Sequence, residues 1–169
     1  ADLSQAQWQA VADLCLEKGL LPFIDIAYQG LGDGLDEDAW GLRHVASRVP
    51  EMLIAASCSK NLGLYRERVG ATLFLGDSRE SAQVLASQGM HAARKIYSMP
   101  PAHGAILAGM VLTDAQLAAN WRAELADMCD RINSLRALLD EKLSAASGRD
   151  FSFIRREKGM FSFLGLTPD

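Results

Sequence analysis

The chain has few cysteines, little net charge and no long apolar run. Its three cysteines, Cys15, Cys58 and Cys129, are odd in number and widely separated, a pattern typical of reduced thiols and not of a disulfide framework. Crossing a bilayer takes about 20 consecutive apolar residues, and no such run is present. A recognisable signal peptide is missing as well. We therefore expect a cytoplasmic protein with no membrane partner.

Several kinds of chemistry also lack support. The formal net charge of −4, without lysine and arginine clusters interleaved with aromatic residues, argues against nucleic acid as a partner. The histidines, His44, His91 and His103, do not have the paired spacing of a metal cluster, so no metal is expected. Because no Gly-x-Ser-x-Gly elbow occurs, serine hydrolase chemistry is not indicated.

A glycine-rich and acidic segment at residues 30–38 needs a separate interpretation. The spacing Gly30-x-Gly32-x-Gly34 differs from the dinucleotide-binding pattern and no lysine follows it, so we interpret it as a connecting loop. The four carboxylates at positions 33, 36, 37 and 38 surround an expected helix start, where acids favour the helix dipole and the free amides. Capping therefore explains them better than a glycosidase pair.

Strands and helices alternate along the chain in a way that predicts an α/β fold. The 169 residues, 49% hydrophobic and 22% charged, suffice for a globular core. Ser4 and Gly19 mark the start and stop of a first helix, and a strand–helix–strand unit follows. The expected strands are 21–27, 52–57, 71–76, 151–154 and 160–163, and the later helices are 36–48, 78–95, 101–112 and 114–144.

Two apolar patterns predict burial. The run at 73–75 indicates a third strand in a sheet that is covered on both faces. The longest helix has apolar residues at steps of three and four, which is typical of a packed core stripe and not of a cofactor site. This stripe consists of Leu117, Trp121, Leu125, Met128, Ile132, Leu135 and Leu139.

One lysine stands in a turn that suits covalent chemistry. Lys60 follows the apolar strand at 52–56 and lies among hydroxyls and glycine, with Arg68 eight residues later. Taken alone, a Ser-x-Ser-Lys run is more often a solvated, idle lysine. A lysine that forms a Schiff base, with Ser57 and Arg68 to bind a phosphate, would nevertheless suit the phosphorylated aldehyde pyridoxal phosphate.

A second segment favours the cofactor interpretation. The run 22–30 looks like a buried strand interrupted by Asp25 and closed by Tyr28 and a glycine turn. A buried carboxylate is costly unless it is paired, and a protonated pyridinium nitrogen would be such a partner. The phenol of Tyr28 has a donor for the cofactor's ring oxygen.

These segments resemble the class I aminotransferases that use pyridoxal phosphate, in particular the aspartate and aromatic amino acid aminotransferase group. The resemblance covers nearly the whole chain. Its motifs are Asp25-x-x-Tyr28, Ser57-x-Ser59-Lys60-Asn61-x-Gly63-Leu64-Tyr65-x-Glu67-Arg68-Val69-Gly70, Tyr97-Ser98-x-Pro100-Pro101-x-x-Gly104-Ala105 and Gly159-Met160-Phe161-Ser162-Phe163.

The resemblance implies a role for each residue around the cofactor. Lys60 would carry pyridoxal phosphate as an internal aldimine, and Asp25 would pair with the pyridine nitrogen. Tyr28 would donate to the ring oxygen. Ser57 and Arg68 would bind the phosphate.

The resemblance also implies a substrate-binding arginine and a homodimer. Arg94, three residues before Tyr97, would bind the distal carboxylate of a dicarboxylic substrate from the neighbouring subunit. Met99 stands where related sequences usually have a polar residue, which is a departure from the family pattern.

The fold implied is part of the three-layer αβα large domain of fold type I pyridoxal phosphate-dependent transferases. Residues 1–113 would belong to that domain, and 114–169 would form an interdomain helix and the start of a small α+β domain. The chain lacks an initiating methionine and family members continue past both ends, so we expect an internal fragment. Without the family's stacking aromatic residue and α-carboxylate-binding arginine, the fragment alone is expected to be inactive.

The function implied is transamination between an amino acid, aspartate or aromatic, and 2-oxoglutarate. Two alternatives stay open at this point. A lyase or decarboxylase on the same scaffold would keep Lys60, Asp25, Tyr28 and Arg68 but would not need Arg94. A non-catalytic domain would keep only the scaffold, and the intact Lys60 argues against it.

Overall fold

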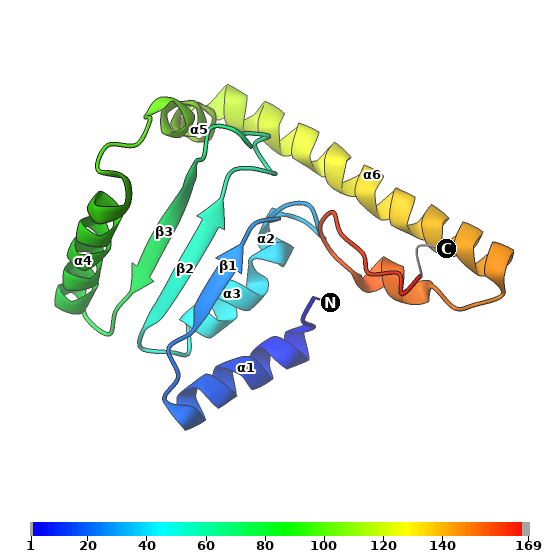
Figure 1. Cartoon of the computed structure of the whole chain (residues 1–169), viewed down its shortest axis with the longest axis horizontal. Coiled ribbons are helices and arrows are strands. Elements are labelled where there is room, and N and C mark those ends of the chain that lie inside the picture. Colours follow the sequence, from blue (N-terminus) through cyan, green and yellow to red (C-terminus); the bar gives the residue numbers. More distant parts are fainter. Residues whose placement is uncertain (1, 167–169) are drawn as a thin grey trace.

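The computed structural model describes residues 2–166 and contains one three-stranded sheet. The strands are β1 (Phe23–Ile26), β2 (Met52–Ser57) and β3 (Gly70–Leu75), in the spatial order β1-β2-β3 (Figure 1). β1 runs parallel to β2, with Asp25 opposite Ala55, and β3 runs antiparallel to β2. The three expected strands in this half of the chain are therefore confirmed, each within two residues of its expected ends.

The first helix follows its sequence signals closely. α1 (Gln5–Lys18) begins with a capping box between Ser4 and Gln7 and ends at Gly19, whose φ is 61°. A backbone conformation in this left-handed region favours glycine, because glycine has no Cβ to clash with the neighbouring backbone. The predicted start and stop of this helix are confirmed.

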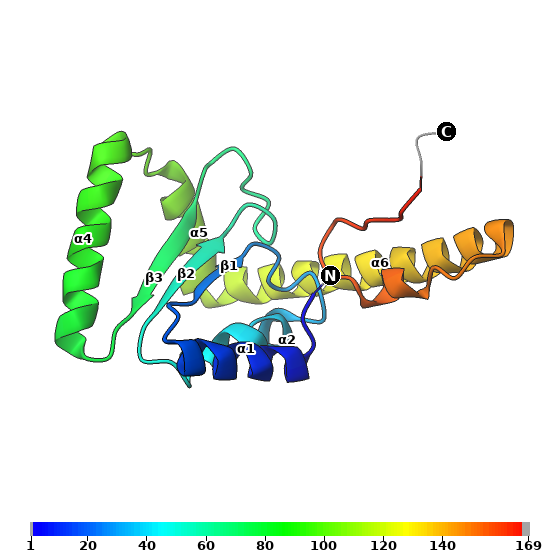
Figure 2. The same cartoon turned by 60° about the horizontal axis from the view of Figure 1, so that its bottom comes forward.

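The helix expected over 36–48 is divided in two. α2 (Leu35–Asp38) ends at Ala39, and α3 (Trp40–Ala46) begins directly after it. α1 and α3 pack on one face of the sheet, which Figure 2 shows from the side. The core between them is formed by Ala12, Cys15, Val45, Val49, Met52 and Ile54.

The opposite face of the sheet is largely open within the described residues. Phe23 of β1 is 66% exposed and Asp25 is exposed too, so the strand expected at 21–27 is present but its predicted burial is wrong. Part of this face is covered by the helix after β3, where Gly89 touches the ring of Phe74. On the core face the third strand is also less buried than predicted, since Leu73, which is paired with Ile54, is 48% exposed.

Three helices follow the sheet, as the sequence predicts. They are α4 (Arg79–Tyr97), α5 (His103–Thr113) and the long α6 (Ala115–Ser147). Asp114 caps α6 by accepting hydrogen bonds from the amides of Gln116 and Leu117. α6 runs past the carboxyl ends of β1 and β2 and extends well beyond the sheet (Figures 1 and 2).

The buried face of α6 differs from the predicted stripe. Leu117, Met128, Leu135 and Leu139 are between 40% and 53% exposed, whereas Leu125 is buried as predicted. The residues that face inward are Ala118, Leu125, Cys129, Arg136 and Asp140. Apolar residues occupy more than one face of this helix, so periodicity alone did not select the correct one. The choice depends on polar partners, because the thiol of Cys129 donates to the carbonyl of Gly32.

The two strands predicted at 151–154 and 160–163 are wrong. The first is a 3-10 helix, Ser152–Arg156, and the second has no regular structure. The carbonyls of Ile154, Gly159 and Phe161 accept hydrogen bonds from the guanidinium of Arg136, at 3.2, 2.6 and 3.1 Å, in place of the strand pairing that was predicted.

The division into domains at residue 113 stays a prediction. No helix among residues 2–166 has the length and apolar character needed to cross a membrane.

Candidate active site

Lys60 lies in a tightly bonded turn after β2. The amide of Ser59 donates to Oγ of Ser57 at 3.1 Å, and the amide of Gly63 donates to the carbonyl of Lys60 at the same distance. The amide of Cys58 donates to the carbonyl of Val69, which closes the loop from 58 to 69. Lys60 is therefore held by its backbone while its side chain is half-buried.

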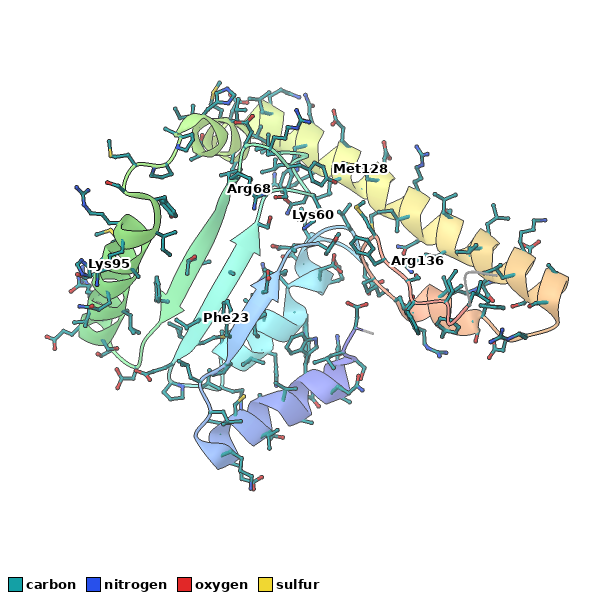
Figure 3. The ribbon with its side chains drawn as sticks, viewed as in Figure 1. Phe23, Lys60, Arg68, Lys95, Met128 and Arg136 are labelled. Atoms are coloured by element: carbon teal, nitrogen blue, oxygen red, sulfur yellow. The ribbon has the colours of Figure 1, made fainter. Side chains whose placement is uncertain are left out.

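The lysine side chain meets the tyrosine that the sequence singles out. Nζ of Lys60 is 4.8 Å from the centroid of the Tyr28 ring. The two residues follow parallel neighbouring strands, whose carboxyl ends lie at the same edge of the sheet. Figure 3 shows Lys60 at this edge, with Arg68 near it. A cation over an aromatic face is attracted by the ring quadrupole.

Asp25 and Ser57 lie on one face of the sheet, next to this edge. Asp25 is paired with Ala55, and Ser57 is two residues further along β2, so the three side chains point the same way. The opposite face carries Ile24 and Ile54, which belong to the core.

Arg68 is the remaining member of the cofactor set. Its φ of 49° is in the left-handed region, and its guanidinium donates to the carbonyl of Tyr65 at 3.1 Å. The adjacent Glu67 contacts His103, with Oε2 2.8 Å from Nδ1. Among residues 2–166 Arg68 has no hydrogen bond to Ser57 or Lys60, so the structure brings it to the same edge without closing a phosphate site.

Arg94 is not brought to this edge. It lies in the last turn of α4, which packs beside β3 on the side away from β1. Figure 3 shows its neighbour Lys95 on that helix, far from Lys60. The structure therefore joins Lys60 with Tyr28, places Asp25, Ser57 and Arg68 beside them, and leaves Arg94 apart.

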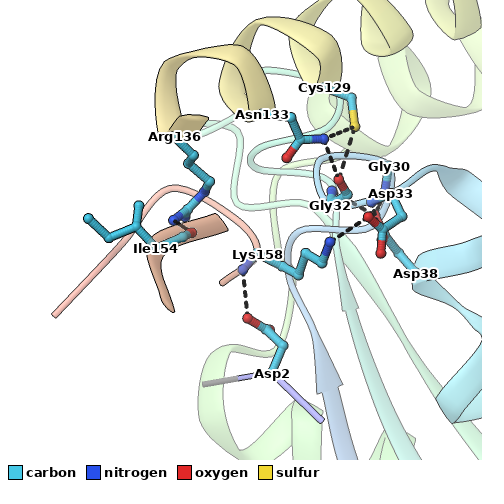
Figure 4. A network of polar contacts seen from close by, with 10 residues as sticks. All are labelled: Asp2, Gly30, Gly32, Asp33, Asp38, Cys129, Asn133, Arg136, Ile154 and Lys158. Atoms are coloured by element: carbon cyan, nitrogen blue, oxygen red, sulfur yellow. Dashed lines mark hydrogen bonds and ion pairs between the residues drawn. The ribbon is translucent and has the colours of Figure 1, made fainter. Parts of the chain in front are cut away.

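The acidic group lies at a helix start, as predicted, with Asp36, Glu37 and Asp38 in the first turn of α2, but it does not supply a side-chain cap. Asp38 instead accepts hydrogen bonds from the amides of Gly30, Gly32 and Asp33, at 2.8, 2.9 and 2.8 Å (Figure 4). The glycine segment is thus a connecting loop, as predicted, whose amides are already bound. Lys158 pairs with Asp33 and donates its amide to Asp2.

Two features near Lys60 were not assigned a role from the sequence. Asn61 donates to the carbonyl of Gln29 at 3.2 Å and accepts from Trp121, and Glu67 meets His103. Both residues belong to the lysine motif, the run from Ser57 to Gly70, but their partners are distant in sequence.

Burial raises the pKa of the Cys58 thiol, which agrees with a packed thiol and not a nucleophile.

The whole chain matches one protein-family model. Residues 1–169 fit the model described as aminotransferase class I and II. The chain belongs to this family. It resembles the aromatic-amino-acid aminotransferase of Pseudomonas aeruginosa, with 45% identity over 99% of this chain and 42% of that protein. It resembles the aspartate aminotransferase of Escherichia coli (strain K12), with 47% identity over 99% of this chain and 43% of that protein.

Solved aminotransferases share the fold. An aromatic amino acid aminotransferase with 3-indolebutyric acid has a TM-score of 0.94 and 47% identity, covering 99% of this chain and 43% of that one. The aromatic-amino-acid aminotransferase of Burkholderia pseudomallei, covalently bound to pyridoxal phosphate, has a TM-score of 0.94 and 43% identity, covering 99% and 42%. The predicted α/β fold type is confirmed. The chain spans about 43% of the length of such relatives.

The family depends on pyridoxal phosphate, and the residues at this edge fit that group. Lys60 has an amine for the aldehyde, and Asp25 has a carboxylate for a protonated ring nitrogen. Ser57 and Arg68 have hydrogen-bond donors for a phosphate. Among the residues from 2 to 166, no group of three or more metal-binding side chains is arranged around a common point.

Proposed function

We propose that the protein is a transaminase that moves an amino group between aspartate or an aromatic amino acid and 2-oxoglutarate, with pyridoxal phosphate attached to Lys60. The observation that carries this proposal is the position of Lys60 Nζ, 4.8 Å from the Tyr28 ring at the carboxyl edge of the sheet. Membership of the aminotransferase family supports it.

Lys60 has two tasks in this proposal. Its Nζ would hold the cofactor's aldehyde carbon between turnovers, and as a free amine it would take the α-proton of the substrate and deliver it to the C4′ carbon of the cofactor. The bound cofactor supplies an electron sink for the charge that develops when this proton leaves. The turn that fixes the Lys60 backbone keeps Nζ close to where this proton transfer occurs.

The other residues bind and orient. Asp25 keeps a proton on the ring nitrogen, Tyr28 donates to the ring oxygen, and Ser57 and Arg68 hold the phosphate. Asp25 is exposed in this chain. Because water weakens a solvated ion pair, its effect requires that other parts of the complete protein exclude solvent from this face.

Substrate selection is assigned to Arg94. Its guanidinium matches a distal carboxylate in the bidentate manner. Since α4 holds Arg94 away from Lys60, the proposal includes a homodimer in which each subunit supplies this arginine to its partner. The proposed location of the complete protein is cytoplasmic, and this chain alone is proposed to be inactive.

Replacing the lysine tests the function. In the complete protein loaded with cofactor, Lys60→Ala should abolish the visible absorbance of the attached cofactor and nearly all transamination. Lys142→Ala is a matched control, because Lys142 is 70% exposed on α6. Retention of both absorbance and turnover in Lys60→Ala would contradict the proposal.

A further inference from the structure

Asn61, the residue after Lys60, connects three separate parts of the chain. Its side-chain Nδ2 donates to the carbonyl of Gln29 at 3.2 Å, and its backbone carbonyl accepts from Nε1 of Trp121 at 2.7 Å. Gln29 follows Tyr28, while Trp121 lies on α6. One residue therefore ties the lysine turn both to the tyrosine segment and to the long helix.

The orientation of the Asn61 amide follows from its partner. A backbone carbonyl only accepts, so the NH₂ group of Asn61 must face Gln29. Oδ1 then points into the protein and has no hydrogen-bond partner among residues 2–166. The contact that the Asn61 side chain makes among these residues is therefore the one to Gln29, next to Tyr28.

The hydrogen bond to Gln29 sets the distance between the two backbone segments that carry Lys60 and Tyr28. Each of its ends is one residue from a member of the pair whose side chains approach to 4.8 Å. The bond from Trp121 holds the backbone carbonyl of the same residue, so the turn is fixed at two points. Loss of either bond would let the Lys60 backbone shift, and small displacements of a reacting group slow a reaction strongly.

We propose that Asn61 is a positioning residue that holds Nζ of Lys60 in place for cofactor attachment, with Trp121 as its second support. This inference rests on the proposed function of Lys60. Asn61 itself does not touch the reacting atoms in this account. Its effect appears in how fast and at what pH the lysine bonds the aldehyde, and not in whether the protein folds.

The experiment uses the complete protein, freed of cofactor and then mixed with pyridoxal phosphate. The rate at which visible absorbance appears reports attachment, the pH midpoint of that absorbance reports the surroundings of Nζ, and the melting temperature reports stability. Asn61→Ala should slow attachment on the order of tenfold and move the pH midpoint, with little change in melting temperature. Trp121→Phe, which keeps an aromatic ring and loses the donor, should slow attachment to a lesser degree.

Three control variants make the result decisive. Asn120→Ala removes an exposed asparagine of α6 whose side chain accepts a hydrogen bond from Gln116 on the same helix, and it should attach cofactor at the wild-type rate. Val49→Ala weakens the buried core away from the site, and it should lower the melting temperature without slowing attachment. Lys60→Ala should give no visible absorbance.

Two results would overturn the role of Asn61. The first is an attachment rate and a pH midpoint in Asn61→Ala that equal those of the wild type. The second is an attachment rate in Val49→Ala as slow as that in Asn61→Ala, because the slowing would then follow from lower stability alone. Absorbance that persists in Lys60→Ala would instead refute the proposed function, so the two failures are distinguishable.

Discussion

Nζ of Lys60 lies 4.8 Å from the centre of the Tyr28 ring, although the two residues are far apart in sequence. The pairing of β1 with β2 places both residues at one edge of the sheet, and the loop from 58 to 69 holds the lysine there. The rest of that loop is anchored at α5, where Gly104 packs against Glu67. The geometry at Lys60 therefore depends on residues outside the lysine motif.

Gly104→Ala should disturb the loop that carries Arg68. A Cβ at this position would lie 2.7 Å from Cβ of Glu67 and 2.9 Å from its carbonyl oxygen, so the loop must move. We expect weaker retention of pyridoxal phosphate, measured by the rate at which the loaded complete protein loses absorbance on dilution.

Gly109→Ala is the matched control for this change. Gly109 lies on the same helix with no atom within 4 Å of its added Cβ. Alanine is the better helix former by about 1 kcal/mol, so this variant should be as stable as the wild type or more so, with unchanged cofactor retention. Similar cofactor loss in both variants would argue against the contact between Gly104 and Glu67.

Asp38→Ala should destabilise the protein more than Asp36→Ala. Asp38 accepts three backbone amides of the glycine loop, whereas Asp36 makes an exposed ion pair with Arg43. Loss of the Asp38 carboxylate leaves those amides without their acceptor, which costs about 1–3 kcal/mol, while an exposed pair contributes about 0–1 kcal/mol. Urea unfolding of the two variants measures the difference, and an equal loss would show that the loop does not need Asp38.

Arg136→Ala should release the segment that follows the 3-10 helix. The Arg136 guanidinium is buried and bonds the carbonyls of Ile154, Gly159 and Phe161. Its removal leaves these carbonyls unsatisfied and should cost about 3 kcal/mol or more of stability. Hydrogen exchange over residues 152–162 should accelerate in this variant. It should stay unchanged in Arg131→Ala, where the arginine is exposed on the same helix.

The elements with local signals were predictable from the sequence. Ser4 and Gly19 bound the first helix as expected because capping depends on residues only a few positions apart. The buried face of α6 was not predictable in the same way. Cys129 and Arg136 face inward because their partners are carbonyls of the Gly32 loop and the 152–161 segment, and such partners cannot be read from helical spacing.

The candidate site was predictable as a set of residues but not as an arrangement. The motifs singled out Lys60 and Tyr28, and the structure brings them together. Asp25 was expected to be buried, yet it is exposed because its side chain points to the face of the sheet opposite the core, which is largely uncovered within the described residues. The supports of the lysine, Gln29 and Trp121, lie 32 and 60 residues from Asn61, beyond the reach of any local pattern.

Reversing the charge of Arg94 should change the choice of substrate. If its guanidinium binds the distal carboxylate, Arg94→Glu should lower kcat/KM for aspartate by at least about a hundredfold and for aromatic amino acids far less. Because no residue of α4 is buried, the melting temperature should hardly change. Equal losses for both substrate classes would remove Arg94 from substrate selection.

The most direct test of the central claim is the site of cofactor attachment. The complete protein, loaded with pyridoxal phosphate, is reduced with borohydride to make the lysine bond permanent, and the modified peptide is sequenced by mass spectrometry. We predict one phosphopyridoxyl group, on Lys60. Modification of another lysine such as Lys95 or Lys158, or no stable modification at all, would contradict the account.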